Sequence, residues 1–301
     1  MALLIGANLP DVDVLAYVGG PNFPLAFRRG WTHGVLALFV LPIVLTAVLA
    51  GLDRLVGRLR GAVLPSDVRP RQLLLLSFIA VWSHPLLDTL NVYGVRWLMP
   101  FAERWFYGDI LFIVDPWLIL VLGAGVWLSR RRGRSRELFR NEPGRPARVA
   151  LATAIAYIAA MTLASSAGSS IATREIAAIT GETPSRVMMG PVPADPFTRR
   201  VVAEQRGGYV VAGFGWLRSP HIEAASLRTF PRGPWRDPLV QAAARDPDAR
   251  DWLVWARFPA VTIAPADAAQ TGRTVVHFMD IRYAEAPNSG FGSIAVPVGG
   301  R

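Results

Sequence analysis

The chain has 301 residues, of which 52% are hydrophobic and only 18% are charged, and its net charge is +10. This length is enough for two domains. The chain has no cysteine, which excludes disulfides and thiolate metal sites, so a bound metal would need His, Asp, Glu, Asn or water as ligands.

The positive charge comes entirely from arginine, since the sequence contains no lysine. A basic chain can indicate nucleic-acid binding. Here a dense group of arginines lies between two apolar segments, where membrane topology alone would place it. We therefore interpret the charge as a topology signal and expect no nucleic-acid partner.

The first segment, MALLIGANLPDVD, lacks the basic start and the cleavage site of a signal peptide. Pro10 and two aspartates interrupt it after nine residues, so we predict that it is too short to span a membrane. Four later segments have about 20 apolar residues each, enough to cross the hydrocarbon as helices. They cover residues 31–52, 72–90, 110–128 and 149–171.

Arginine is unevenly distributed over the connecting loops. Loop 53–71 holds five arginines, loop 129–148 holds eight, and loop 91–109 holds only Arg96 and Arg104. The positive-inside rule places the first two loops in the cytoplasm and the third outside. This orientation also puts the N-terminal segment and the C-terminal residues on the outer side.

From residue 172 onward the sequence is rich in Pro, Gly and Arg. Strands are predicted over 209–217, 251–258 and 273–283 from their β-branched and aromatic content, and residues 237–250 could form a short helix. We predict a four-helix, all-α, multi-pass membrane domain over 1–171, followed by a small extramembrane α+β domain over 172–301 on the outer face.

Ionisable side chains within apolar spans are costly, at about 2.5 to 3.5 kcal/mol for Asp at the centre of a helix. His84 and Asp88 lie four residues apart, so they share one helix face, and Asn91 follows on the same face. With the predicted topology, two histidines and five aspartates converge on one side of the membrane. They are Asp11, Asp13, His33, His84, Asp88, Asp109 and Asp115.

This set suits a divalent metal, since imidazole favours Zn²⁺ and several carboxylates would suit Mn²⁺ or Mg²⁺. Bound metal would activate a water and polarise an ester or phosphoryl group, which is hydrolytic chemistry. Simpler explanations exist for single residues. Asp11 and Asp13 could cap a helix, Asp115 before Pro116 could belong to a turn or cap, and Arg28 and Arg29 could pair with the aspartates, bind an anionic substrate or contact lipid.

The segments GANLPDVDVLAY, RRGWTHG, SHPLLDTLNVYGVRWLMPF and WFYGDILFIVDPW resemble, in order and spacing, the bacterial membrane-bound metal-dependent hydrolases of the YdjM type. The resemblance covers roughly residues 5–125, and WARFP and MDIRY are similar to the tail of some longer members. It implies a multi-pass inner-membrane protein distantly similar to zinc-dependent phospholipase C and the S1/P1-type nucleases. The ligands it implies are Asp11, Asp13, His33, His84 and Asp88.

The family's pattern also has a Thr-His pair upstream of the Pro-Asp-x-Asp motif, and this chain begins after that point. That leaves two alternatives, a start that is placed too late or a protein with one ligand and one helix fewer than the family's pattern.

Our leading hypothesis is a membrane-embedded hydrolase that uses a divalent metal, preferably zinc, with Asp11, His33 and Asp88 as catalytic residues. Its expected partners are membrane lipids and an ester, phosphoester or lipid substrate. The alternative is a non-catalytic membrane scaffold with a structural or vestigial metal site. A transporter is disfavoured because the polar residues gather at one face instead of lining a path.

Overall fold

The computed structural model describes the whole chain except residues 20–22, 60–68, 135–142, 265–273 and 300–301. Parts of both predicted basic loops therefore lie outside the described residues. The chain forms two compact units. The first comprises Met1–Tyr107, Pro234–Asp280 and Ala286–Arg301, and the second comprises Gly108–Gly233 and Ile281–Glu285.

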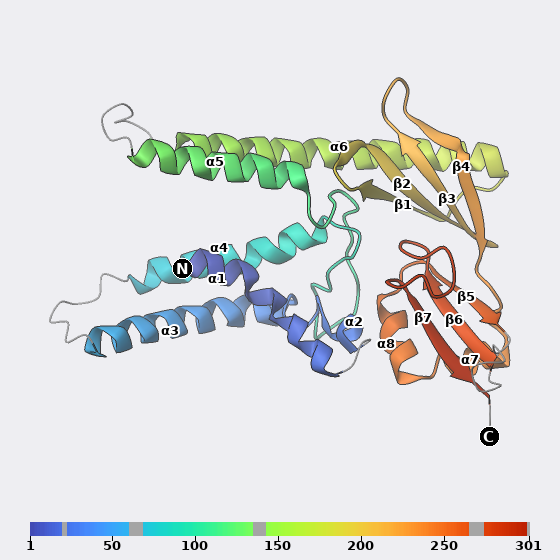
Figure 1. Cartoon of the computed structure of the whole chain (residues 1–301), viewed down its shortest axis with the longest axis horizontal. Helices are drawn as coiled ribbons and strands as arrows, with labels where there is room; N and C mark the ends of the chain where they lie inside the picture. The colour runs from blue at the N-terminus through green and yellow to red at the C-terminus, as the bar shows by residue number, and fades with distance from the viewer. Residues whose placement is uncertain (20–22, 60–68, 135–142, 265–273, 300–301) are drawn as a thin grey trace. The chain divides into compact units, whose positions relative to one another are not determined.

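The N-terminal part of the first unit is helical. It contains α1 (Ala2–Asn8), the 3-10 helix η1 (Leu9–Gly19), α2 (Phe23–Phe27), α3 (Val35–Leu59) and α4 (Pro70–Thr89). In Figure 1, α1 lies beside α4, and α3 and α4 run in opposite directions.

Small and polar residues bring these helices together. A Cβ on Gly6 would lie 2.7 Å from Cβ of Ala80, so α1 can approach α4 this closely only because Gly6 has no side chain. The indole Nε1 of Trp82 donates to the carbonyl of Leu38 at 2.9 Å. This bond joins α4 to α3, and the packing leaves the start of η1 and the end of α4 next to the turn before α3.

The C-terminal part of the first unit is α+β. Helices α7 (Pro238–Ala243) and α8 (Pro247–Trp255) precede an antiparallel sheet of order β5-β6-β7. Its strands are Pro259–Ala264, Thr274–Asp280 and Ser293–Val298, so the strand predicted over 273–283 is confirmed by β6.

The strand predicted over 251–258 is wrong, because most of that segment belongs to α8. The carboxylate of Asp246 accepts hydrogen bonds from the backbone N–H groups of Asp248 and Ala249, which caps a helix that starts at Pro247. Trp252 and Trp255 are both buried and are three residues apart, so they lie on one helical face. The spacing of the two indoles outweighs their strand propensity.

The second unit combines two long helices with a sheet. Helices α5 (Pro116–Arg134) and α6 (Arg145–Thr180) lie side by side in Figure 1. The strands, in the order β1-β2-β3-β4, are Arg186–Val192, Asp195–Gln205, Gly208–Gly215 and His221–Pro231. The strand predicted over 209–217 is confirmed by β3. Ala172 and Ile176 of α6 are fully buried against the sheet, in a core with Val201, Val210 and Phe214.

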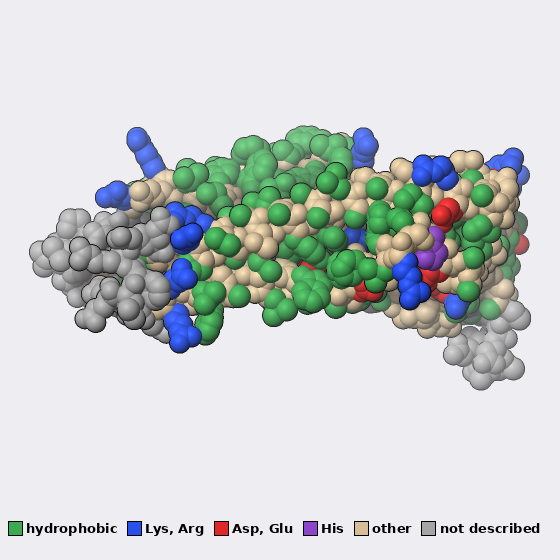
Figure 2. Space-filling view, turned by 90° about the horizontal axis from the view of Figure 1, so that it is seen from above, with side chains coloured by type: hydrophobic (Ala, Val, Ile, Leu, Met, Phe, Trp, Pro, Cys, Tyr) green, Lys and Arg blue, Asp and Glu red, His purple; other side chains and the backbone are tan. Residues whose placement is uncertain are grey.

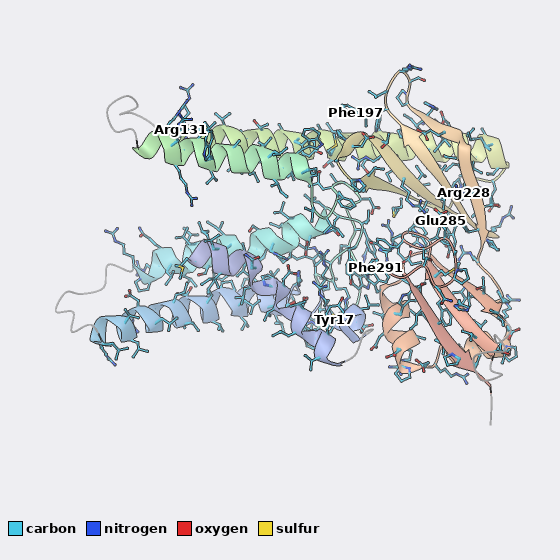
Figure 3. All side chains as sticks on the ribbon, in the orientation of Figure 1. Tyr17, Arg131, Phe197, Arg228, Glu285 and Phe291 are labelled. Atoms are coloured by element: carbon cyan, nitrogen blue, oxygen red, sulfur yellow. The ribbon has the colours of Figure 1, made fainter. Side chains whose placement is uncertain are left out.

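The 36 residues of α6 extend about 54 Å, well beyond the roughly 30 Å of hydrocarbon in a bilayer. Apolar side chains cover much of the helical surface seen in Figure 2, and arginines gather at one end of it. On the sheet, Glu285 pairs with Arg200 and with Arg228, and Figure 3 labels Arg228 and Glu285. These two ion pairs tie the segment Ile281–Glu285 to β2 and β4.

The prediction of a four-helix, all-α membrane domain is wrong. Among the described residues three helical segments are long and apolar enough to cross a membrane, and they are Ala2–Gly19, Val35–Leu59 and Arg145–Thr180. The first was predicted to be too short, but the helix continues past Pro10 in 3-10 form. The predicted boundary at residue 171 falls inside α6, and as a boundary between membrane and water it stays a prediction.

The predicted spans 72–90 and 110–128 are not among these three segments, and the bounds and composition of their helices explain why. In α4, Arg71 and Gln72 at one end and His84 and Asp88 near the other lower the mean hydropathy. In the predicted span 110–128, the helix begins only at Pro116 and then runs into the arginines that start at Arg130. A C-terminal α+β part is present, as predicted.

Candidate metal centre

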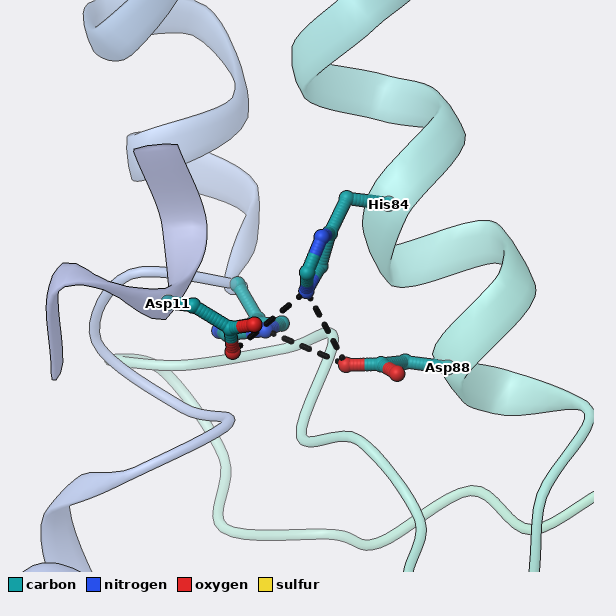
Figure 4. Close-up of side chains that lie close together, drawn as sticks. Asp11, His84 and Asp88 are labelled. Carbon is teal, nitrogen blue, oxygen red and sulfur yellow. Dashed lines mark ion pairs between the residues drawn. The ribbon is translucent and has the colours of Figure 1, made fainter. Parts of the chain in front are cut away.

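Four of the predicted ligands come together in the first unit, and each reaches the same place from a different position in the chain. Asp11 lies in η1, His33 lies in the turn before α3, and His84 and Asp88 lie one turn apart near the end of α4. Figure 4 shows the side chains of Asp11, His84 and Asp88 pointing toward one another.

Local sequence explains the position of His33. The backbone N–H of Gly34 donates to the carbonyl of Gly30 at 2.6 Å, and the N–H of Val35 donates to the carbonyl of Trp97 at 2.9 Å. A Cβ on Gly34 would lie 2.5 Å from the carbonyl oxygen of Met99. Glycine is therefore required here for the turn to pack against the segment that follows α4, and this packing places His33 beside α4.

The distances match a small coordination sphere. Nε2 of His84 is 3.3 Å from Oδ2 of Asp88 and 3.5 Å from Oδ1 of Asp11. Nε2 of His33 is 3.3 Å from the same Asp88 oxygen, and one ligand atom from each of the four residues lies within 4.8 Å of the others. Zinc bonds of about 2.0 to 2.2 Å give donor separations of about 3.3 to 3.6 Å in a tetrahedron.

Both imidazoles present Nε2 to the cluster because Nδ1 is occupied elsewhere. Nδ1 of His84 lies 2.6 Å from the carbonyl oxygen of Ala7, to which it can only donate. Nδ1 of His33 lies 2.9 Å from the hydroxyl of Thr32 and 3.5 Å from Oδ2 of Asp13. A hydrogen-bond partner on the second nitrogen fixes the tautomer and ring orientation of a metal-binding histidine.

Asp13 occupies a supporting position. It is buried and accepts hydrogen bonds from Nε of Arg28, the backbone N–H of Arg29 and the hydroxyl of Thr32, at 2.9, 2.9 and 3.0 Å. Burial would lower the pKa of Arg28, but the hydrogen bond to Asp13 raises it, so this arginine remains cationic. Asp13 is outside the group of four, and its predicted role as a metal ligand stays a prediction.

The two carboxylates of the cluster differ in environment. Asp88 uses Oδ1 for an ion pair with Arg29 at 3.1 Å, which leaves Oδ2 toward the histidines. Asp11 is the most open of the four, with 44% of its side chain exposed, and its Oδ1 is 3.6 Å from Arg28. Solvent can therefore approach the cluster from the side of Asp11 and Arg28.

Three cluster atoms are buried and have no hydrogen-bond partner among the described residues. They are Nε2 of His33, Nε2 of His84 and Oδ2 of Asp88. Leaving a buried donor or acceptor unsatisfied costs about 1 to 3 kcal/mol. Two imidazole nitrogens and a carboxylate oxygen form a donor set that suits zinc, so the residues fit a bound divalent cation.

Asp109 and Asp115 belong to the second unit and are not members of the cluster. Oδ1 of Asp115 accepts hydrogen bonds from the backbone N–H groups of Trp117 and Leu118, and Oδ2 accepts one from the hydroxyl of Tyr157 at 3.1 Å. This is a helix cap at the start of α5, the simpler explanation considered above. Asp109 is buried with a φ of +55°, and its role as a ligand stays a prediction.

Some supporting groups could not be selected from the sequence. The carbonyl of Ala7, the hydroxyl of Thr32 and the ring of Tyr93 all contribute to the surroundings of the cluster. A carbonyl has no sequence signal, and Tyr93 resembles any interfacial aromatic residue. Thr32 has the one usable signal, since it directly precedes His33.

An apolar helical region with a histidine and aspartate cluster at the helix ends defines a membrane protein with a candidate metal centre. The model of the YdjM inner membrane protein family matches residues 1–167, and the chain belongs to this family. It is 23% identical over 131 residues to the uncharacterized protein YfhP of Bacillus subtilis (strain 168), which covers 43% of this chain. The match spans 36% of YfhP, and no solved structure matches the chain.

Proposed function

We propose that the protein is a membrane-embedded, metal-dependent hydrolase that cleaves an ester or phosphoester at the outer face of the bacterial inner membrane. The observation that carries the proposal is the convergence of Nε2 of His33, Nε2 of His84 and Oδ2 of Asp88, which are all buried and have no hydrogen-bond partner among the described residues. Two histidines and one carboxylate form the three-ligand set used by several catalytic zinc sites.

Zinc held by such ligands lowers the pKa of a bound water and polarises an ester or phosphoryl oxygen. Two side chains of the protein would supply proton transfer and substrate binding. Asp11, on the open side, is placed to accept a proton as a general base. Arg28 lies 3.6 Å from Asp11 and stays charged, so an anionic phosphoester suits this entrance better than a neutral ester.

The positions of the arginines support the outer face. Arg54 and Arg58 lie in the last turns of α3, and Arg69 and Arg71 lie at the start of α4. The cluster is at the opposite ends of the same two helices. The positive-inside rule then assigns the arginine end to the cytoplasm and the cluster to the other side.

Hydrolysis by purified protein in detergent, with zinc or with a chelator, tests the proposal. Chromogenic phosphodiester, phosphomonoester and carboxylic ester substrates cover the proposed chemistry. We expect zinc-dependent turnover that falls by about 10²- to 10⁴-fold in Asp11→Asn, the usual contribution of a general base, while zinc stays bound. Arg28→Gln should raise KM for the phosphoester more than for the carboxylic ester.

A scaffold with a structural metal site predicts a different result. All four side chains would then close the coordination sphere, as in structural zinc sites. Zinc-loaded wild-type protein with no turnover on any of the three substrates, and an Asp11→Asn variant that binds zinc more weakly, would favour the scaffold over the enzyme.

A further inference from the structure

Arg29 is outside the group of four but contacts one of its members, Asp88. Nη2 of Arg29 is 3.1 Å from Oδ1 of Asp88, and Nη1 donates to Oδ1 of Asn91 at 3.1 Å. Arg29 is buried. Since Oδ1 is engaged by Arg29, the other oxygen of Asp88 faces the two histidines.

An aromatic ring holds the guanidinium of Arg29 from another side. Its Cζ lies 4.6 Å from the centre of the Tyr93 ring, within the distance of a cation–π contact. Tyr93 itself is buried, and its backbone N–H donates to Oδ1 of Asn91 at 2.9 Å. Asn91 and Tyr93 therefore form one support for Arg29.

The C-terminal part of the first unit supplies the next layer. The centre of the Trp255 ring, in α8, lies 5.3 Å from the centre of the Tyr93 ring. The Trp255 ring also contacts the ring of Phe291, which Figure 3 labels, at a centre-to-centre distance of 5.4 Å. Trp255 is buried, with 1% of its surface exposed. The indole of Trp105 also donates to the carbonyl of Val254 at 2.9 Å, so a second contact joins α8 to the segment after α4.

We propose that Trp255 is a positioning residue of the metal centre, which acts through Tyr93 and Arg29 on Asp88. The inference rests on the metal site of the proposed function and adds a role for a region beyond residues 1–167, the part matched by the family model. The C-terminal α+β part is then a structural component of the site, because its aromatic core limits the movement of a carboxylate ligand.

The test measures zinc affinity of the full-length protein in detergent by competition with a chromophoric chelator. Loss of a supporting contact around a metal ligand typically weakens binding by about 10- to 100-fold. We expect Tyr93→Leu to fall in this range and Trp255→Leu to be near its lower limit, about tenfold. Trp255→Phe, which keeps an aromatic ring against Tyr93, should recover most of the affinity.

A matched control separates positioning from a general loss of stability. Phe278 is fully buried in the same C-terminal core, where its ring contacts Trp235 and Trp252. Phe278→Leu should lower the unfolding temperature while zinc affinity stays unchanged. The visible absorption spectrum of Co²⁺-loaded protein gives a second readout, and we expect it to change in Trp255→Leu but not in Phe278→Leu.

The outcomes distinguish this inference from the proposed function. Equal zinc affinity and equal Co²⁺ spectra in Trp255→Leu and Phe278→Leu, with zinc bound by the wild type, would overturn the positioning role alone. A folded wild type that binds neither zinc nor Co²⁺ would overturn the metal centre and the positioning role together.

Discussion

Asp88 and Asp115 look alike in the sequence, since each is the acidic residue of an apolar segment and each is next to or near a proline. In the structure their surroundings differ. Oδ2 of Asp88 is buried with no hydrogen-bond partner among the described residues and faces two histidines. Both oxygens of Asp115 accept hydrogen bonds, from the first turn of α5 and from Tyr157.

The comparison teaches that an acidic residue in an apolar segment has two different explanations. A helix cap satisfies its carboxylate with backbone N–H groups that would otherwise lack partners, so nothing further is needed. A carboxylate that converges with imidazoles from its own helix and from a distant turn leaves polar atoms unsatisfied, and a cation would compensate them. The second arrangement, and not the acidic residue itself, indicates a site.

The largest expected effect separates these two explanations directly. His84→Ala combined with Asp88→Ala removes two of the three buried ligand atoms that have no hydrogen-bond partner among the described residues, so we expect bound zinc to disappear from the purified protein. Elemental mass spectrometry of wild type and variant, after zinc is supplied, measures this. Zinc retained in the double variant at the wild-type ratio would mean that the cluster is not the site.

A smaller effect is expected at Asp13, which orients His33 from outside the cluster. Asp13→Asn removes the charge but keeps an acceptor for Thr32, so we expect zinc affinity to fall by about 10- to 100-fold, as for other supporting residues. Chelator competition measures the change. Complete loss of zinc, as in the double variant, would instead make Asp13 a ligand, which is what the sequence predicted.

The smallest effect is expected at Asp115. Asp115→Ala removes the cap of α5 and the partner of Tyr157, so we expect a loss of about 0.5 to 2 kcal/mol in unfolding free energy. Zinc content should be unchanged. Thermal unfolding, together with elemental analysis, checks both statements, and a variant that unfolds normally but has lost its zinc would contradict the assignment of Asp115 as a cap.

Much of the candidate site could be predicted from the sequence. The spacing of His84 and Asp88 places both on one helix face, and the cost of burying charge in apolar helices singles out the others. The choice among seven candidates could not be made, because it depends on which elements pack together. Gly6 against Ala80 and Gly34 against the Met99 carbonyl decide that packing, and neither contact has a sequence signal.

Helix boundaries show the same division. Apolar composition by itself determined that the chain has membrane-spanning segments, because an uncharged run of that length has few other stable environments. Only the tertiary structure decided where the helices begin. The cap at Asp115 moves the start of α5 to Pro116, and η1 extends the N-terminal helix past Pro10. Composition averages over a window of residues, whereas a cap depends on one side chain and its nearest backbone N–H groups, and a supporting ring such as Trp255 depends on contacts between residues far apart in the chain.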